Sequence, residues 1–318
     1  MRVIYFGTPA FAVPSLAALT AAHEVVAVVT QPDRPRGRGQ KVTPNPVKAL
    51  AVSRGIPVLQ PAGLRDPQWL GDIAALRADI GVVAAYGRLL PQALLGLPRL
   101  GFINVHASLL PRWRGVAPIH RALIAGDDVT GVTIMRVVLE LDAGPMLSAA
   151  SIPIAGDDTS HTLELRLATL GADLLIETMS RLDAGTVVET PQDESLVTYA
   201  ARLERHESRI SWARPAPEID RQIRGLQPWP LAAAIVEGKR VAFLQSSVVD
   251  TTVHSTMPGT VLSATAAGLV VACAPGAVCI TEVLPEGRRA MPVAAFLNGT
   301  PVARGSLIHP LPSSGAAS

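Results

Sequence analysis

The sequence predicts an α/β domain built on an open, mostly parallel sheet with helices on both faces, followed by a small C-terminal β-barrel domain. Two observations predict this fold class. Buried-strand runs alternate with amphipathic segments as far as residue 184, which is typical of a parallel sheet with crossover helices. From residue 232 onward, short alternating apolar runs are separated by Gly and Pro, which is typical of a small barrel.

Length and composition limit the class of protein. With 318 residues, 48% of them hydrophobic and 17% charged, the chain is expected to form two globular domains. No basic segment followed by a long apolar one begins the chain, and no apolar run reaches the roughly 18 residues of a membrane span, so we expect a soluble cytoplasmic protein. The formal net charge is only +2, so a nucleic-acid partner would need a local basic patch. Cys273 and Cys279 lie in apolar sequence without a nearby histidine at metal-ligand spacing and are predicted to be buried thiols.

The N-terminal segment predicts a β-α-β unit. Residues 2–6 and 25–30 are predicted strands, and residues 13–22 form the predicted helix between them. Gly7 is the only glycine in the first strand-to-helix turn, so the glycine fingerprint of dinucleotide-binding proteins is absent and a nicotinamide enzyme is excluded.

Further elements are predicted from periodicity along the rest of the chain. Helices are expected at 49–54, 66–77, 119–125, 160–184 and 217–226, and strands at 56–59, 80–85, 101–105 and 131–138. The leucines of 160–184 share one helical face, so this helix is expected to pack on the sheet and close the first domain. His120 is expected at the surface. Five short strands are expected in the barrel, at 232–236, 240–249, 259–264, 268–274 and 277–284.

Two candidate catalytic residues lie at the end of the predicted strand GFINV: Asn104 within it and His106 directly after it. Asn104 and His106 are two residues apart and therefore point to the same face, whereas Ile103 and Val105 point to the other. The carboxyl ends of parallel strands are where open α/β sheets bind ligands. Asp142 comes later, directly before an Ala-Gly turn, and could orient the imidazole or accept a proton.

An Asn, a His and an Asp without a Ser or Cys nucleophile suggest that one substrate attacks another directly, without a metal. The Asn104 amide and a protonated His106 could donate to an oxyanion on a carbonyl carbon, while Asp142 keeps the imidazole charged and accepts the proton of an attacking amine. The same residues are also compatible with structural roles: Asn104 capping a turn, His106 ending a strand and Asp142 starting a turn. Their spacing leaves both interpretations open.

Residues 31–48, QPDRPRGRGQKVTPNPVK, form the most basic surface segment. Its prolines and glycines predict a loop without regular structure. Asp33 is its one acidic residue, against five cations, namely Arg34, Arg36, Arg38, Lys41 and Lys48. A loop of this charge suits contact with phosphates, although a solvated basic loop has the same pattern.

The stretch NVHASLLPRWRGVAPIHRALIAGDDVTGVTIM, followed by LDAGPML, resembles the core of the folate-dependent formyltransferases. Their pattern is Asn-x-His-x-Ser-Leu-Leu-Pro with a later Asp, so the resemblance implies that Asn104, His106 and Asp142 are catalytic. It also implies a set of formyl-folate contacts, namely Ser108, Leu109, Leu110, Pro111, Tyr86 and Gly87. Tyr86 could equally be an ordinary aromatic wall. The turn GTPxF at 7–11 is implied to lie beside the active site, or is simply a tight turn.

Other motifs occur in the order of the same family: QPDRPxGRG, QDESLVTYA and QPWP. The first is similar to the loop with which the members that formylate initiator methionyl-tRNA engage its acceptor end. Arg38 matches the arginine of that loop, so Arg38, Arg36 and Lys41 are the implied tRNA contacts. The implied reaction transfers a formyl group from 10-formyltetrahydrofolate to the α-amine of methionine on initiator tRNA, by a monomeric enzyme without a metal.

The resemblance also implies a domain organisation: a Rossmann-like catalytic domain at 1–189, a linker at 190–207, and an oligonucleotide-binding (OB)-like, tRNA-binding domain at 208–318. Residues 190–318 contain 11 Lys and Arg against 10 Asp and Glu, so tRNA binding there would depend on few side chains. The candidates are Arg202, Arg205, Lys239, Arg240, Arg288 and Arg289.

Two other functions are compatible with parts of this pattern. The same three polar residues could serve another acceptor, either water, as in a formyl-folate hydrolase, or an amino-sugar nucleotide. The basic loop, the QPWP motif and the barrel-like tail argue against both. A non-catalytic RNA-binding protein on the same scaffold is opposed by the presence of Asn104, His106 and Asp142.

Overall fold

The computed structural model describes residues 1–36, 41–250 and 256–312. The chain divides into two compact units. The first consists of Met1–Pro118, Val129–Pro153 and Glu164–Ala200, and the second of Ile119–Asp128, Ile154–Leu163 and Ala201–Ser318. Two short segments that interrupt the first unit along the chain, Ile119–Asp128 and Ile154–Leu163, therefore belong to the second unit. No described helix has an apolar stretch long enough to cross a membrane.

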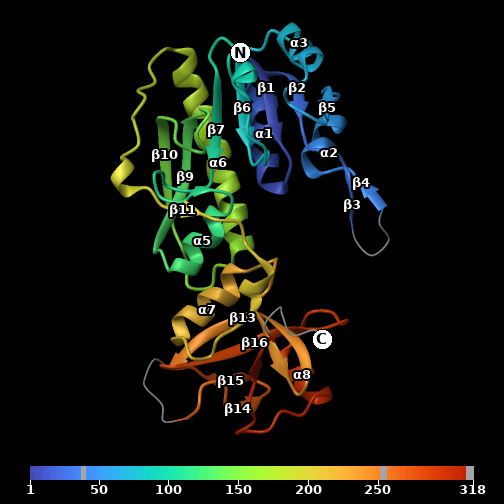
Figure 1. Ribbon diagram of the computed structural model, residues 1–318, viewed down its shortest axis with the longest axis vertical. Coiled ribbons are helices and arrows are strands. Elements are labelled where there is room, and N and C mark those ends of the chain that lie inside the picture. Colours follow the sequence, from blue (N-terminus) through green and yellow to red (C-terminus); the bar gives the residue numbers. More distant parts are fainter. Residues whose placement is uncertain (37–40, 251–255, 313–318) are drawn as a thin grey trace. The chain divides into compact units, whose positions relative to one another are not determined.

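The first unit contains a seven-stranded sheet with the order β10-β9-β7-β6-β1-β2-β5 (Figure 1). Its strands are β1 (Arg2–Gly7), β2 (Glu24–Val29), β5 (Val58–Leu59), β6 (Ile80–Ala84), β7 (Phe102–His106), β9 (Val129–Arg136) and β10 (Met146–Pro153). The five strands from β7 to β5 are parallel, β9 is antiparallel to β7, and β10 is antiparallel to β9. The predicted open, mostly parallel sheet is confirmed.

Helices cover both faces of this sheet, as predicted. They are α1 (Val13–Ala22), α2 (Pro46–Ser53), α3 (Pro67–Ala75), α4 (Gln92–Leu95) and the greater part of α6 (Ser160–Asp183). Phe102 of β7 packs in one cluster with Ile73 of α3 and Leu94 of α4. On the opposite face α6 approaches so closely that a Cβ at Gly171 would lie 2.9 Å from Val105. Neighbouring residues of β7 therefore point into two different layers.

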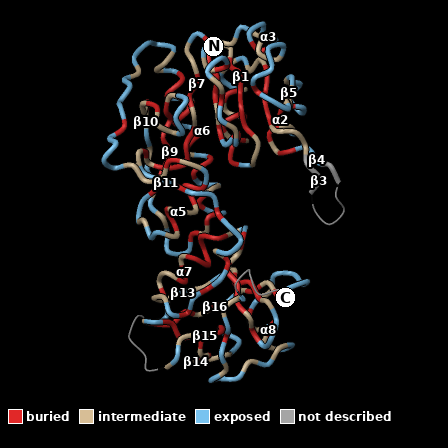
Figure 2. The backbone as a smooth tube through the Cα atoms, viewed as in Figure 1, coloured by how far each residue is buried: buried red, intermediate tan, exposed pale blue. Residues whose placement is uncertain are grey.

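The core of the first unit follows the central strands, where Figure 2 shows the buried residues. β1 and β2 consist mainly of Val, Ile and aromatic residues, which suit a strand that is buried on both faces. Asp66 caps the N-terminus of α3, because its carboxylate accepts hydrogen bonds from the free N–H groups of Gln68 and Trp69. The strand order changes direction between β1 and β6, and an open α/β sheet binds ligands at such a point.

The second unit contains an antiparallel sheet with the order β14-β15-β16-β13-β12-β18, which curls into a half-barrel (Figure 1). Its main strands are β12 (Ala233–Val236), β13 (Lys239–Asp250), β14 (Val261–Thr265), β15 (Gly268–Ala272) and β16 (Ala277–Pro285). These are the five predicted strands. Two short strands, β17 (Met291–Pro292) and β18 (His309–Pro310), and two helices, α7 (Ala216–Gly225) and α8 (Val293–Gly299), complete it.

The expected exposure of His120 is wrong. This residue belongs to α5 (Pro118–Ala125), most of which packs within the second unit, where a Cβ at Gly225 would lie 2.4 Å from Ile124. His120 is half-buried as a result. Burial lowers the pKa of its imidazole below the usual value, although the hydrogen bond with the Gln227 backbone raises it.

Candidate active site

Asn104 and His106 lie at the carboxyl end of β7 and share the face that carries Phe102, as the two-residue spacing predicts. β7 is a central strand, parallel to β6 on one side and antiparallel to β9 on the other. The position of both side chains is therefore fixed by hydrogen-bonded neighbours. His106 is buried and Asn104 is half-buried.

Asp142 reaches this face by an indirect route. Because β9 is antiparallel to β7, its last residue, Arg136, pairs with Ile103 and not with the residues at the carboxyl end of β7. The segment 137–145 must therefore fold back to bring Asp142 to Asn104. It turns sharply: Asp142 has a φ of 51°, and a Cβ at Gly144 would lie 2.0 Å from the Arg136 carbonyl oxygen. Only glycine fits at that position.

The Asp142 carboxylate is held by two hydrogen bonds. Its Oδ1 accepts from the Asn104 Nδ2 at 3.4 Å, and its Oδ2 accepts from the backbone N–H of Gly115 at 2.9 Å. Oδ2 also lies 3.7 Å from the His106 Nδ1. The side chains of His106 and Asp142 are 6% and 12% exposed, so little water screens this pair.

The second ring nitrogen of His106 defines the tautomer. Nε2 lies 3.0 Å from the backbone carbonyl oxygen of Trp113. Since a carbonyl can only accept, Nε2 carries a hydrogen, and a second proton on Nδ1 would create an imidazolium facing the Asp142 carboxylate. The three predicted residues are thus brought together, with the His106 Nδ1 facing the Asp142 carboxylate. Their participation in catalysis stays a prediction.

The predicted formyl-folate segment forms a tight turn directly after His106. The Ser108 hydroxyl donates to the Arg112 carbonyl at 2.7 Å. Thr133 of β9 donates to the Ser108 carbonyl at 2.7 Å and accepts from the Leu110 N–H at 3.1 Å. Ser108 and Leu110 are buried, whereas Leu109 and Pro111 are half-buried. The turn is therefore rigidly attached to the sheet beside the three polar residues.

Tyr86 lies at the carboxyl end of β6, as predicted, but its side chain belongs to the core. It is 2% exposed and packs edge-on against Phe6, with ring centroids 5.3 Å apart, and burial raises the pKa of its hydroxyl. Its backbone carbonyl accepts from the Gln31 Nε2 at 2.9 Å and from the Thr8 hydroxyl at 3.5 Å. Gly87 follows with a φ of 79°. A ligand at this strand end would thus meet the backbone rather than the ring.

The basic segment contains a short hairpin, which the sequence did not predict. β3 (Arg34–Arg36) pairs antiparallel with β4 (Lys41–Thr43). The prediction of a loop without regular structure is therefore wrong at these positions, because a proline such as Pro35 is tolerated in an edge strand. Arg38 lies outside the described residues, and the side chains of Arg36 and Lys41 are likewise not among the described ones.

Lys48, one of the five cations counted in this segment, has partners inside the protein. Its ammonium donates to the Asp33 carboxylate and, at 2.8 Å, to the Gln60 Oε1. The hydrogen bond from Lys48 lowers the pKa of Asp33 below its usual value. Lys48 therefore fixes the base of the hairpin.

Three contacts of the site were missed by sequence reasoning: the Trp113 carbonyl, the Gly115 N–H and the Gln192 amide. The first two are backbone groups, which carry no sequence signal. Gln192 donates to the carbonyls of Asp142 and Gly144, both at 2.8 Å. Its only sequence signal is its position in the motif QDESLVTYA, within the segment interpreted as a connector.

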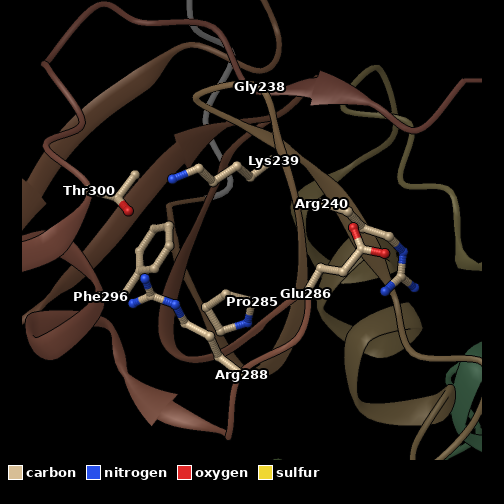
Figure 3. A pocket seen from close by; sticks show the side chains of 8 residues that line it. All are labelled: Gly238, Lys239, Arg240, Pro285, Glu286, Arg288, Phe296 and Thr300. Carbon is tan, nitrogen blue, oxygen red and sulfur yellow. The ribbon is translucent and has the colours of Figure 1, made fainter.

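In the second unit, a hollow of ≈ 280 Å³ is lined by Gly238, Lys239, Arg240, Pro285, Glu286, Arg288, Phe296 and Thr300 (Figure 3). Three of the predicted RNA contacts, Lys239, Arg240 and Arg288, therefore line one hollow, together with the acidic Glu286. Figure 3 shows the Lys239 ammonium directed toward Thr300 and the Arg288 guanidinium beside Phe296. Arg240 also lines a second hollow, of ≈ 320 Å³, with Arg205, Ser208, Trp229 and Pro230. Within the described ranges, no group of three or more His, Cys, Asp or Glu side chains is placed to hold a metal ion.

Comparison with known proteins identifies the class. The formyl transferase family matches residues 1–179, and the formyl transferase C-terminal domain matches residues 202–301. The fold and the match together define a formyl transferase enzyme.

The methionyl-tRNA formyltransferase of Paracoccus denitrificans is 50% identical over 299 residues, covering 94% of this chain and 97% of the relative. That of Methylococcus capsulatus is 48% identical over 299 residues, covering 94% and 96%. The chain belongs to this family, the methionyl-tRNA formyltransferases.

Solved structures share the fold at lower identity. The N-formyltransferase of Helicobacter canadensis, in complex with folinic acid and dTDP-3-aminofucose, superimposes with a TM-score of 0.67 at 18% identity, covering 88% of this chain and 98% of the other. HypX of Aquifex aeolicus, in complex with tetrahydrofolic acid, superimposes with a TM-score of 0.62 at 17% identity, covering 97% and 50%. At these identities the likeness concerns the fold alone.

Proposed function

We propose that this enzyme transfers the formyl group of 10-formyltetrahydrofolate to the α-amine of methionine on initiator tRNA. The observation that carries the proposal is the meeting of Asn104, His106 and Asp142 at the carboxyl end of β7, in a chain of this family. Its relatives' name, methionyl-tRNA formyltransferase, supports the acceptor.

The reaction needs hydrogen-bond donors for an oxyanion and an acceptor for a proton. The amine of methionine attacks the formyl carbon, a new C–N bond forms, and the bond between that carbon and the folate nitrogen breaks. An amide nitrogen has two hydrogens, so Asn104 can bond the Asp142 Oδ1 and the oxyanion together. Asp142 accepts the proton that the amine loses, and the departing folate nitrogen receives a proton in return.

His106 contributes through its charge and through Nε2. In the free enzyme the Nε2 hydrogen bonds the Trp113 carbonyl, so donation to the substrate requires that the oxyanion replaces this carbonyl. During this exchange the Asp142 Oδ2, which lies 3.7 Å from the His106 Nδ1, stabilises the positive charge of the imidazolium. Removal of one donor to an oxyanion typically costs about 10²- to 10³-fold in kcat.

The donor is proposed to contact the turn at Ser108, Leu109, Leu110 and Pro111 and the strand end at Tyr86 and Gly87. The tRNA is proposed to contact Arg36, Arg38 and Lys41 in the first unit. In the second unit, the hollow offers the Lys239 ammonium and the Arg288 guanidinium to phosphates, whereas Figure 3 shows the Arg240 guanidinium on its other side, beside Glu286. Trp229, 48% exposed beside Arg205 in the neighbouring hollow, offers an aromatic face to a base.

We also propose that the enzyme is a cytoplasmic monomer without a metal, with a catalytic domain at 1–189, a linker at 190–207 and a tRNA-binding domain at 208–318. Size-exclusion chromatography with light scattering tests the monomer. A mass near twice the 33.3 kDa of one chain would contradict it.

The test of the function is transfer of labelled formyl from 10-formyltetrahydrofolate, with methionyl initiator tRNA, methionyl elongator tRNA and water as competing acceptors. A reaction without enzyme serves as the control for uncatalysed transfer. We expect labelled initiator tRNA in large excess over the other products. Release of labelled formate without labelled tRNA would support the hydrolase alternative and overturn the proposal.

A further inference from the structure

A polar cluster lies next to the Asp142 turn; its Arg114 and Gln192 are buried, whereas the side chain of its Glu194 is 71% exposed. It consists of Arg114, Gln192 and Glu194, here called the Gln192 clamp. Arg114 is 0% exposed and is the largest completely buried side chain among the described residues. Its Nε donates to the Gln192 Oε1 at 2.9 Å, and its Nη1 and Nη2 donate to the Glu194 carboxylate at 3.3 and 2.7 Å.

The clamp determines the orientation of the Gln192 amide. A guanidinium has only donors, so the amide oxygen must face Arg114 and the amide nitrogen must face the opposite way. There Nε2 donates to the carbonyls of Asp142 and Gly144, both at 2.8 Å, so each of its hydrogens has one acceptor. Gln192 thus holds the turn on both sides of Ala143.

Besides Gln192, the turn is held by the two hydrogen bonds of the Asp142 carboxylate and by the Arg136 N–H, which donates to the Pro145 carbonyl at 2.9 Å. The preceding residues are exposed although apolar, with Leu139 59% and Leu141 43% exposed, so this segment is not anchored by burial. Asp142 itself has a φ of 51°, in the left-handed region that residues other than glycine adopt less often. Such a conformation persists only where neighbouring groups enforce it, and the two bonds from Gln192 do so here.

Arg114 connects the clamp to the carboxylate as well. It forms β8 (Arg114–Gly115) with Gly115, whose N–H donates to the Asp142 Oδ2, and β8 pairs with β11 (Tyr199–Ala200). Burial by itself lowers the pKa of the Arg114 guanidinium, but the bond and charge of Glu194 raise it above the usual value. The guanidinium therefore keeps its charge.

We propose that Gln192 is a positioning residue for formyl transfer. It fixes the backbone of Asp142 so that the carboxylate meets Asn104 and His106, and Arg114 with Glu194 fixes the orientation of Gln192. This inference rests on the proposed role of Asp142 in the reaction. Gln192 acts through Asp142 and does not touch the substrate.

The test uses two substitutions. Gln192→Met removes both donors at nearly constant volume, and a displacement of the carboxylate by about 1 Å would lower kcat about 10²-fold. KM for the folate and for tRNA is expected to stay within about twofold, since the substrates do not contact Gln192.

Gln192→Glu keeps an acceptor for Arg114 and so protects the fold, but its ionised carboxylate cannot donate to the two carbonyls. Its carboxylate stays ionised beside the Arg114 cation, so its kcat is expected to fall as that of Gln192→Met does.

Gln222 provides a matched control. It is 6% exposed, its Nε2 donates to the carbonyls of Glu207 and Arg209 at 2.7 and 3.1 Å, and its Oε1 accepts from the Arg214 Nη1 at 3.4 Å. Gln222→Met therefore removes the same kind of bonds far along the chain from Asp142. We expect it to lower the Tm as Gln192→Met does and to leave kcat unchanged.

Two results would overturn the inference: a kcat of Gln192→Met within about twofold of that of Gln222→Met, or a kcat of Gln192→Glu within about twofold of that of the wild type. Asp142→Asn, measured beside them, separates this failure from that of the proposed function. If Asp142→Asn is inactive and Gln192→Met is fully active, only the role of the clamp is lost. If both are fully active, the catalytic assignment of Asp142 fails.

Discussion

Replacement of Asp142 by Asn tests the chemistry of the site with almost no change of shape. One carboxylate oxygen becomes an NH₂ group. The bond from the Gly115 N–H is the shorter at 2.9 Å and comes from the backbone, so the remaining oxygen is expected to keep it. The NH₂ group then faces the Asn104 Nδ2, where two donors meet across a separation of 3.4 Å, and a bond is lost.

The variant also loses its negative charge and its proton acceptor. Nothing anionic then faces the His106 Nδ1 from 3.7 Å away, and the amine's proton has no carboxylate to accept it. Loss of such a general base typically lowers the rate by about 10²- to 10⁴-fold, equivalent to about 3–5.5 kcal/mol of transition-state stabilisation. KM should change by less than about threefold, because the interaction strengthens only in the transition state.

Steady-state and single-turnover transfer of labelled formyl, at saturating concentrations of both substrates, measures this effect. Asp79→Asn is a suitable control, since Asp79 also accepts a backbone N–H, from Arg2 at 2.8 Å, and pairs with Arg99 at 3.2 Å outside the site. The control should lose some stability and keep its kcat. An Asp142→Asn enzyme with kcat within about threefold of the wild type would refute the reasoning.

Three further predictions concern other parts of the chain. Gly144→Ala places a Cβ 2.0 Å from the Arg136 carbonyl oxygen, so both Tm and kcat should fall, as thermal melts and transfer assays would report. The pKa of His120 is lower in the folded protein than its usual value of 6.5. As the pH falls below 6.5, the unfolded chain therefore binds this proton more readily than the folded protein, and the free energy of unfolding decreases. His120→Gln should flatten this slope, which is at most about 1.4 kcal/mol per pH unit, in urea titrations between pH 5 and about 7. Arg38→Ala should weaken tRNA binding. In filter-binding assays, the dependence of log K on log salt concentration should lose about one phosphate contact from its slope. An unchanged slope would mean that Arg38 does not contact tRNA and that the segment is a solvated basic loop.

Local signals in the sequence account for most of the fold. The predicted helix at 13–22 coincides with α1, and the helix predicted at 160–184 differs from α6 by one residue. β10 has no counterpart among the predicted elements, because MLSAASIP consists largely of small residues and proline, and only one of its eight residues is buried. Its pairing with β9 determines it, and pairing partners cannot be read from periodicity.

The site was predictable only in part. Asn104 and His106 could be assigned to one face because they are neighbours in a strand, for which the period of two is fixed. The contact of Asp142 with them depends on the antiparallel direction of β9 and on the returning segment 137–145, which no local pattern encodes. Gln192 lies 50 residues from Asp142 along the chain and appears as part of a polar connector until its two bonds are seen.

The kcat of Asn104→Ala, measured beside the dissociation constant of 10-formyltetrahydrofolate, tests the central claim that the end of β7 is the catalytic site. The amide donates to Asp142 and, in our account, to the oxyanion. We predict a loss of about 10²- to 10³-fold in kcat with donor binding changed by less than about threefold. An unchanged kcat would contradict the account, whatever the variant did to stability.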